Sequence, residues 1–335
     1  MRCGWTCEGR LAAGGGAGQS WGVTKQALII DCDPGVDDAV GLMLALNALE
    51  LEILAITAVG GNVPVSATSR NARMLAQVAG REDIAVFAGA DRPLVREPAG
   101  AGEFHGAEGL GDQAPFEPAA PLAAGHAAEA IIEIVRTRPE KAVALAVMGP
   151  MTNLALALRK EPGLARRLGP VSVMGGARAE GGNITASAEF NIWADPDAAA
   201  EVLASDCEVV MFGLDATHQV RATDDRIAAI EAIDSDSARW AAAMMRFSQR
   251  VEKTIVGWDA PPVHDPCTVA WLMRPELFTL RPCEIRVETA SDLTRGHTAV
   301  EFRAPPNRAR HRWAVRADGQ GVFDLIAETL RKAAA

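Results

Sequence analysis

Short apolar runs alternate with segments of helical periodicity along most of this chain. The apolar runs that predict strands cover 27–30, 53–59, 84–87, 142–148, 171–174 and 209–214, with weaker strand-like runs at 284–288 and 298–302. Helical periodicity predicts helices at 39–49, 66–78, 125–136, 152–160, 224–255, 266–273 and 321–330. This alternation is typical of a mostly parallel sheet covered by helices. We therefore predict an α/β fold: a single large domain with a mostly parallel open sheet, Rossmann-like, and flanking helices.

Residues 1–24 stand outside this pattern. The stretch 12–18 is nearly all Gly and Ala, and no linker or repeat interrupts the chain after it. A segment of this composition cannot bury enough apolar surface to fold by itself. We expect residues 1–24 to be a disordered N-terminal extension or a misassigned start, and residues 25–335 to form the domain.

An acidic octamer follows the first predicted strand: Asp31-Cys32-Asp33-Pro34-Gly35-Val36-Asp37-Asp38. Buried carboxylates cannot all remain ionised without a cation, because an unpaired buried charge is energetically costly. The Pro-Gly pair permits a tight turn that would bring Asp33 and Asp38 together. A hard metal ion would satisfy these carboxylates. The alternative is a surface turn whose aspartates only cap a helix, but the preceding apolar run favours the metal site.

Polar and sulfur-containing residues also follow other predicted strands. Open α/β sheets bind their ligands at the carboxyl ends of the strands. This edge is therefore the expected location of the functional site, and the residues that fall on it are Asp31, Asp33, Asn62, Met148, Met174 and Asp215. The long loop 91–121 contains His105 and is a candidate lid, because loops of this length in compact domains are usually functional or disordered.

Composition narrows the range of partners. The net charge is −10, and nucleic-acid-binding proteins need clustered Lys and Arg, so we expect no nucleic-acid partner. The six cysteines show no CxxC spacing, which predicts neither a disulfide framework nor a zinc site and favours the reducing cytoplasm. No apolar run reaches the ~18 residues that a membrane span requires, so we expect no membrane association.

Taken in order, these motifs resemble those of the inosine-uridine preferring nucleoside hydrolases. The matching stretches are the octamer 31–38, Gly60-Gly61-Asn62, Gly149-Pro150-Met151-Thr152-Asn153, Met174-Gly175-Gly176, Asn183 with Ala188-Glu189-Phe190-Asn191, Gly213-Leu214-Asp215 and Val263-His264-Asp265-Pro266. The match runs from about 27 to 273 and weakens toward the C-terminus. The resemblance implies a calcium-dependent hydrolase that cleaves the N-glycosidic bond of ribonucleosides into ribose and free base, and that forms homodimers or homotetramers.

By the same resemblance, Ca²⁺ would be held by the side chains of Asp33, Asp38 and Asp265 and by the backbone carbonyl of Met148, an oxygen-rich shell that suits this ion. Asp33 would also be the general base. The N-glycosidic bond breaks through an oxocarbenium-like state, which fixed carboxylates and amides stabilise. The residues implied to bind the ribose hydroxyls, or for Met174 to pack near the sugar, are Asp37, Asn62, Met174, Asn183, Glu189 and Asn191.

The candidate for the general acid, which protonates the leaving base, is a histidine. His264 is expected to protonate the leaving base, because a histidine with the ordinary pKa of about 6.5 can donate a proton at mild pH; the alternative is a histidine that only caps the following helix. His105 is a second candidate, for contacting the base or closing the site, and His218 is expected to be structural or to contact the substrate. The chain has no tyrosine, whereas some relatives surround the base with tyrosines from the helical segment before the His-Asp motif. The resemblance therefore carries over no preference for purines or pyrimidines.

Two other functions are compatible with part of this pattern. An Asp-x-Asp after the first strand also begins the haloacid-dehalogenase-like phosphatases, but those usually have Thr or Val two residues after the second Asp, where this chain has Gly35. A non-catalytic protein that binds calcium and nucleosides would be expected to lack Asp33 or His264, and both are present. The hydrolase is the prediction that accounts for all the motifs.

Overall fold

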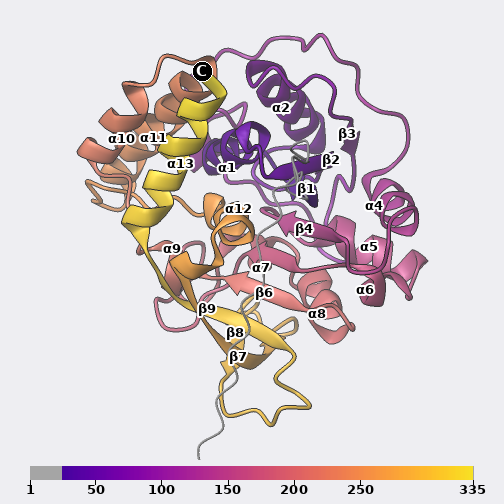
Figure 1. Ribbon diagram of the computed structural model, residues 1–335. Coiled ribbons are helices and arrows are strands. Elements are labelled where there is room, and N and C mark those ends of the chain that lie inside the picture. Colours follow the sequence, from indigo (N-terminus) through magenta and orange to yellow (C-terminus); the bar gives the residue numbers. More distant parts are fainter. Residues whose placement is uncertain (1–24, 335) are drawn as a thin grey trace, which may run out of the picture.

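The computed structural model describes residues 25–334, so the predicted N-terminal extension 1–24 lies outside the described residues. The strands are β1 (Gln26–Cys32), β2 (Leu51–Ala58), β3 (Val86–Ala88), β4 (Val143–Val147), β5 (Val171–Met174), β6 (Val209–Phe212), β7 (Phe278–Val287), β8 (Thr298–Glu301) and β9 (His311–Ala317). They form one nine-stranded sheet in the order β3-β2-β1-β4-β5-β6-β9-β7-β8 (Figure 1). The first seven strands in this order, from β3 at the edge to β9, are parallel to one another. Strand β7 is antiparallel to both β9 and β8. The predicted α/β fold with a mostly parallel sheet is confirmed.

Helices cover both faces of the sheet (Figure 1). They are α1 (Val36–Asn47), α2 (Val65–Val78), α3 (Gly102–His105), α4 (Ala127–Arg136), α5 (Thr152–Lys160), α6 (Leu164–Arg167), α7 (Phe190–Ala194), α8 (Pro196–Ala204), α9 (Leu214–Thr217), α10 (Asp224–Glu231), α11 (Asp236–Ile255), α12 (Pro266–Met273) and α13 (Gly319–Ala334), with a 3₁₀ turn at Pro275–Leu277. On one face, α1 packs against α2, α11, α12 and α13. On the other face, α4 packs against α5 and α6, and α5 packs against α8.

The central strands contribute to a hydrophobic core on each face. Leu28 and Ile30 of β1 pack in the core on the α1 side, and Ile29 between them packs in the core formed with α4 and α5. Successive side chains of a strand point to opposite faces, so both sides of β1 are buried. This explains why the predicted strands are continuous apolar runs rather than alternating ones.

The predicted helix over 224–255 is two helices, α10 and α11. The break at 232–235 is set by local hydrogen bonding, because Ser235 accepts from the backbone N–H of Ala238 and so begins α11. Thr223 caps α10 in the same way. Helix α8 begins in a similar way, since Asp195 accepts from the N–H of Ala198 at 3.0 Å and Pro196 is the first helical residue.

Strand β9 was not predicted from the sequence. It lies between β6 and β7, and its Trp313 is fully buried while Arg312 and Arg316 are exposed. The arginines interrupt the apolar pattern on which strand prediction depends. Among residues 25–334, no helix combines the length and the apolar character needed to cross a lipid bilayer.

Candidate active site

The turn from β1 into α1 is held by the carboxylate of Asp38. Its Oδ1 accepts from the backbone N–H of Asp33 at 3.1 Å, and its Oδ2 accepts from that of Gly35 at 3.0 Å. Asp38 is the third residue of α1, so its carboxylate reaches back to the N–H of Gly35, the residue before the helix, and both Asp37 and Asp38 lie in the first turn, where the helix dipole favours negative charge. The acidic octamer is therefore a buried helix start at the carboxyl edge of the sheet, as predicted.

Asp33 is fully buried beside this turn. Its Oδ2 accepts from the backbone N–H of Asn62 at 2.7 Å, while Oδ1 has no hydrogen-bond partner among residues 25–334. A Cβ atom added to Gly61 or to Gly149 would clash with this carboxylate. Both glycine motifs are thus explained by the close approach of backbone to Asp33.

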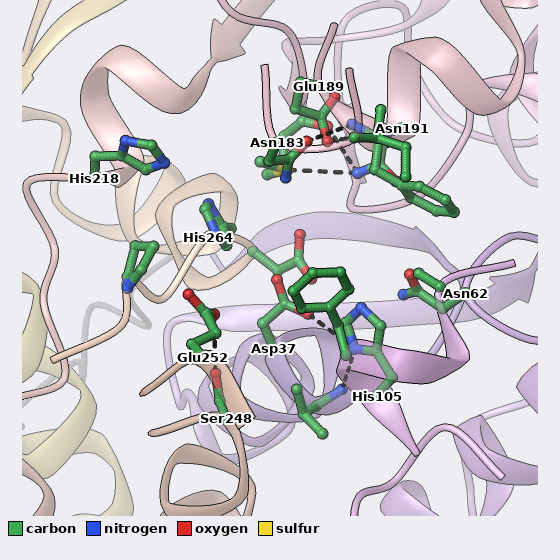
Figure 2. Close-up of a pocket in the computed structure, with 18 of the residues that line it drawn as sticks. Asp37, Asn62, His105, Asn183, Glu189, Asn191, His218, Ser248, Glu252 and His264 are labelled. Atoms are coloured by element: carbon green, nitrogen blue, oxygen red, sulfur yellow. Dashed lines mark hydrogen bonds and ion pairs between the residues drawn. The ribbon is translucent and has the colours of Figure 1, made fainter. Parts of the chain in front are cut away.

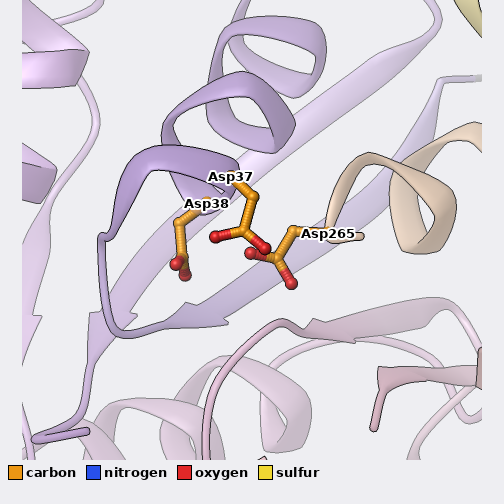
Figure 3. A group of neighbouring side chains, drawn as sticks. All are labelled: Asp37, Asp38 and Asp265. Atoms are coloured by element: carbon orange, nitrogen blue, oxygen red, sulfur yellow. The ribbon is translucent and has the colours of Figure 1, made fainter. Parts of the chain in front are cut away.

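Three carboxylates converge at the end of β1 (Figure 3). Asp37, Asp38 and Asp265 each offer an oxygen, and these oxygens lie within 4.8 Å of one another. Burial, followed by the neighbouring carboxylates, raises the pKa of Asp38 to about 7 and raises the pKa values of Asp33 and Asp265 well above their usual range. The Oδ1 atoms of Asp37 and Asp265 also lack hydrogen-bond partners in the described part of the chain. A buried set of oxygen donors of this kind fits a hard cation such as Ca²⁺.

Only some of the predicted metal ligands belong to this carboxylate cluster. Asp38 and Asp265 belong to it and Asp37 joins them, whereas the carboxylate of Asp33 is not among the oxygens within 4.8 Å. The carbonyl of Met148 accepts from Nδ2 of Asn191 at 2.7 Å, and Met148 borders the same cavity as Asp265.

A cavity of about 330 Å³ opens beside the carboxylates (Figure 2). Its lining residues come from the start of α1, from α3, α7 and α11, from the end of β5, and from the loops that follow β2, β4, β5 and α9 or precede α12. Every residue predicted to contact the substrate borders it: Asp37, Asn62, His105, Met174, Asn183, Glu189, Asn191 and His264. The structure therefore brings together side chains that are far apart in the sequence.

The amide and carboxylate groups on one wall are held by the backbone. Glu189 caps α7, with Oε1 accepting from the N–H of Asn191 at 2.9 Å and Oε2 from that of Gly176 at 2.9 Å, and burial raises its pKa to about 7. Asn191 donates to the carbonyls of Met148 and Met174, and none of the described residues donates to its Oδ1. These contacts fix the amide with an acceptor still available to a ligand.

Two further amides border the cavity. Asn62 donates from Nδ2 to the carbonyl of Asp33 at 3.1 Å and to the carboxylate of Asp38 at 3.2 Å. Asn183 is exposed, and its Oδ1 accepts from the N–H of Phe190 at 2.9 Å. Asn62 is therefore tied to the carboxylates, whereas Asn183 belongs to the loop that covers α7.

His105 reaches the site from the one-turn helix α3 within the long loop. Its Nδ1 accepts from the N–H of Val36 at 3.1 Å, which places the proton of the neutral ring on Nε2. The same Nδ1 lies 3.8 Å from Oδ1 of Asp37, and burial lowers the pKa of the ring. The loop therefore carries His105 to the first turn of α1.

His264 lies on the opposite side of Asp37 in Figure 2. Its Nδ1 is 2.8 Å from Oγ1 of Thr217, and burial lowers its pKa to about 4. The ordinary pKa that we assumed from the sequence does not hold, and the ring is neutral at neutral pH. His218 also borders the cavity, where its Nδ1 pairs with Glu180 at 3.1 Å, so it acquires a partner of its own.

The residues that close the far side of the cavity were not predicted from the sequence. These are Ser248 and Glu252 of α11, with Arg221 and Trp258 from the flanking loops. Burial raises the pKa of Glu252 to about 7. The spacing of a serine and a glutamate four residues apart on a helix places both on one side, and this signal could have identified them.

Two residues at the predicted edge have supporting roles. The carboxylate of Asp31 accepts from Thr57 at 2.6 Å and from Asn153 at 2.8 Å, so it joins β1, β2 and α5 beneath the site. Asp215 accepts from the N–H groups of Arg178 and Ala179, both at 2.9 Å, and so holds the loop after β5. Neither residue borders the cavity.

Comparisons with known proteins identify the family of this chain. The chain matches the family model described as inosine-uridine preferring nucleoside hydrolase over residues 28–324. It is 38% identical over 307 residues to the inosine-uridine preferring nucleoside hydrolase of Crithidia fasciculata, covering 91% of this chain and 97% of the relative. It is 40% identical over 306 residues to a pyrimidine-specific ribonucleoside hydrolase of Salmonella typhimurium, covering 91% of this chain and 98% of the relative.

The fold is similar to solved structures as well. A purine-preferring ribonucleoside hydrolase from Gardnerella vaginalis superposes with a TM-score of 0.86 at 29% identity, covering 92% of this chain and 99% of that one. The predicted resemblance is confirmed, because the family model spans nearly all of the described domain. The chain belongs to the inosine-uridine preferring nucleoside hydrolases, a family of N-glycosyl hydrolases.

Proposed function

We propose that this enzyme uses Ca²⁺ to hydrolyse the N-glycosidic bond of ribonucleosides, releasing ribose and the free base. The observation that carries the proposal is the carboxylate cluster of Asp37, Asp38 and Asp265: Asp37 and Asp265 each have an oxygen without a hydrogen-bond partner among residues 25–334, and both border the same cavity as a wall of amides. Such donors suit both a hard cation and the hydroxyls of a sugar. The sequence motifs that resemble the family supply the residues at these positions.

Asp38, Asp265 and the carbonyl of Met148 would hold the ion, together with Asp33. When bound, Ca²⁺ orients the attacking water and lowers its pKa. Asp33 then accepts the proton of that water through Oδ1, since Oδ2 is engaged by the N–H of Asn62. Because one oxygen of this carboxylate is already hydrogen-bonded, the other is held in a fixed orientation toward the water.

The remaining residues position the sugar and the leaving base. Asp37, Asn62 and Asn191 bind ribose hydroxyls, with Asn183 and Glu189 at the same wall and Met174 against the sugar. Their carboxylates and amide oxygens stabilise the positive charge that develops on the ring. His264 would donate a proton to the departing base from its imidazolium form, in which Nδ1–H donates to the Thr217 hydroxyl and Nε2–H to the base; its lowered pKa makes that imidazolium a stronger acid, and the ring is left neutral.

The experiment is an assay for free ribose with inosine, uridine, cytidine, adenosine and guanosine as separate substrates. Activity that a calcium chelator abolishes and added Ca²⁺ restores would support the proposal. In parallel, thermal unfolding of the chelated protein with and without Ca²⁺ reports whether the ion binds the native state. Release of ribose that persists in chelator would contradict the metal requirement, and the absence of release with Ca²⁺ bound would contradict the reaction.

Two sequence predictions remain predictions. The cysteine pattern favours the cytoplasm, and the resemblance to the family implies a homodimer or homotetramer. Light scattering after size-exclusion chromatography measures the mass of the assembly directly. A monomeric mass at assay concentration would contradict the second prediction.

A further inference from the structure

Asp31 is a fully buried carboxylate that the proposed chemistry does not use. Its Oδ1 accepts two hydrogen bonds, from the hydroxyl of Thr57 at 2.6 Å and from Nδ2 of Asn153 at 2.8 Å. Its backbone carbonyl accepts a third, from the N–H of Met148 at 2.7 Å. One residue of β1 therefore holds both Met148 and Asn153, through its backbone and its side chain respectively.

These two residues are the ends of the segment 148–153, which connects β4 to the first turn of α5. Met148 begins the segment, and its carbonyl is one of the predicted ion ligands. Asn153 ends it as the second residue of α5. Because both hydrogen bonds lead to Asp31, the segment cannot shift relative to β1 without breaking one of them. The Met148 carbonyl is thus fixed from both ends of its own segment.

The amide of Asn153 is fully buried and joins this segment to the neighbouring strands. Besides its bond to Asp31, Nδ2 donates to the carbonyl of Ala58 at 3.1 Å, and Oδ1 accepts from the N–H of Ala90 at 2.8 Å. Ala58 ends β2, and Ala90 follows β3. Asn153 does not border the cavity, so any part that it has in the reaction passes through the groups that it positions.

The Met148 carbonyl is the group that this positioning affects. It accepts from Nδ2 of Asn191 at 2.7 Å, which leaves one of its two lone pairs for an ion. Calcium ligands lie about 2.3–2.6 Å from the ion, so a displaced carbonyl binds it less well. Removal of a group that orients a metal ligand typically costs about 10- to 100-fold in metal affinity or activity.

We propose that Asn153 is a positioning residue that holds the Met148 carbonyl in place for Ca²⁺ and so sets the affinity of the site for the ion. This inference rests on the proposed function, because it concerns the ion that the proposed reaction requires. It gives a role to the last residue of the motif 149–153. Gly89 supports it, because a Cβ atom there would clash with the Asn153 amide, and glycine leaves that amide its space.

The test measures the dissociation constant of Ca²⁺ by isothermal titration calorimetry of the metal-free protein, with calcium chloride as the titrant. In Asn153→Ala this constant should rise about tenfold to a hundredfold. At saturating Ca²⁺, kcat for the best nucleoside should return close to the wild-type value, because the reacting groups themselves are unchanged. An unchanged dissociation constant in folded Asn153→Ala would overturn the inference.

Thr57→Val is the matched control. Thr57 is as fully buried as Asn153 and donates to the same oxygen of Asp31, but its hydroxyl contacts β1 alone, through Asp31 and the carbonyl of Ile30. Both variants lose a buried hydrogen bond and should have lower melting temperatures. Only Asn153→Ala should bind Ca²⁺ more weakly. Equal weakening in both variants would point to a general loss of stability and would also overturn the inference.

A second variant decides the matter if Asn153→Ala does not fold. In Gly89→Ala the new methyl group displaces the Asn153 amide without removing it, so the dissociation constant of Ca²⁺ should still rise severalfold. Gly102→Ala is its control, since a Cβ there meets no atom within 4 Å. Equal constants in these two variants would overturn the inference alone. A wild-type protein that binds no Ca²⁺ would contradict the proposed function and this inference together.

Discussion

The two ends of the cavity are held in different ways. At the carboxylate end, backbone N–H groups fix the side chains: those of Asp33 and Gly35 hold Asp38, and that of Asn62 holds Asp33. At the helix end, the Ser248 hydroxyl is the single donor to the side chain of Glu252 among residues 25–334. Groups fixed by backbone need no reorganisation during the reaction. The comparison teaches that the side chains at the carboxylate end are held by the backbone of the sheet edge, whereas those at the helix end are held by other side chains and can change without disturbing that edge.

The largest effect is expected from removing the proposed general base at the carboxylate end of the cavity. Asp33→Ala should lower kcat by at least about 10³, because a positioned general base contributes roughly 10² to 10⁴ and the site also loses a carboxylate near the ion. The measurement is kcat for the best substrate at saturating Ca²⁺. Asp234→Ala, at an exposed position, serves as the control. A loss below tenfold would remove Asp33 from the role of base.

The next variant tests His264, the proposed proton donor to the departing nucleobase. His264→Ala should lower kcat/KM for inosine by about 10² to 10³, since an unprotonated base is a poor leaving group. An activated aryl riboside, whose leaving group needs no proton, should lose far less. Comparing the two substrates with the same protein preparation separates proton donation from a general disturbance of the site. An equal loss on both would contradict the role given to His264.

A smaller effect is expected from moving Asp33 without removing it. In Gly61→Ala, the new methyl group would clash with the carboxylate and displace it. We expect kcat to fall about tenfold to a hundredfold, as displacements near 1 Å in active sites do, with Asp33 still present. Gly102→Ala is the control, because a Cβ there meets no atom within 4 Å. Unchanged kcat in Gly61→Ala would show that the carboxylate tolerates the shift.

The smallest effect concerns stability at the helix end. Burial raises the pKa of Glu252 from 4.5 to about 7, so between these values the folded protein binds more protons than the unfolded chain. The contribution of this group to stability is therefore greatest at low pH and is lost as the pH rises toward and through 7. Relative to Glu252→Gln, the melting temperature of the wild-type protein should fall from pH 5 to pH 8. A constant difference between the two proteins across this range would contradict the shift.

The carboxylate end could be predicted from the sequence because its residues lie in short motifs. Asp33 directly follows β1, Asp38 lies in the first turn of the helix after it, and Asn62 lies in the short loop after β2, so position along the chain also fixes position at the sheet edge. Their partners are backbone atoms of the same motifs. Local sequence therefore determined most of this geometry, and the resemblance to the family supplied the roles.

The helix end could not be predicted in the same way. Glu252 and Trp258 reach the cavity only because α11 packs against α1, a contact between distant segments that periodicity does not specify. Strand β9 was missed for a related reason, since Trp313 is buried between strands that come earlier in the chain while its arginine neighbours point outward. In both cases tertiary packing decides what the local pattern leaves open.

The position of Asp265 has a consequence for synthesis of the protein on the ribosome. Asp33, Asp37 and Asp38 leave the exit tunnel early, but Asp265 and the helices α11, α12 and α13 that pack against α1 are made last. A nascent chain therefore carries an incomplete acidic cluster and an uncovered first helix until translation is nearly finished. The three carboxylates can come together only after the later segments have docked, so chains that stop short of Asp265 should lack the proposed ion site and be inactive rather than partly active.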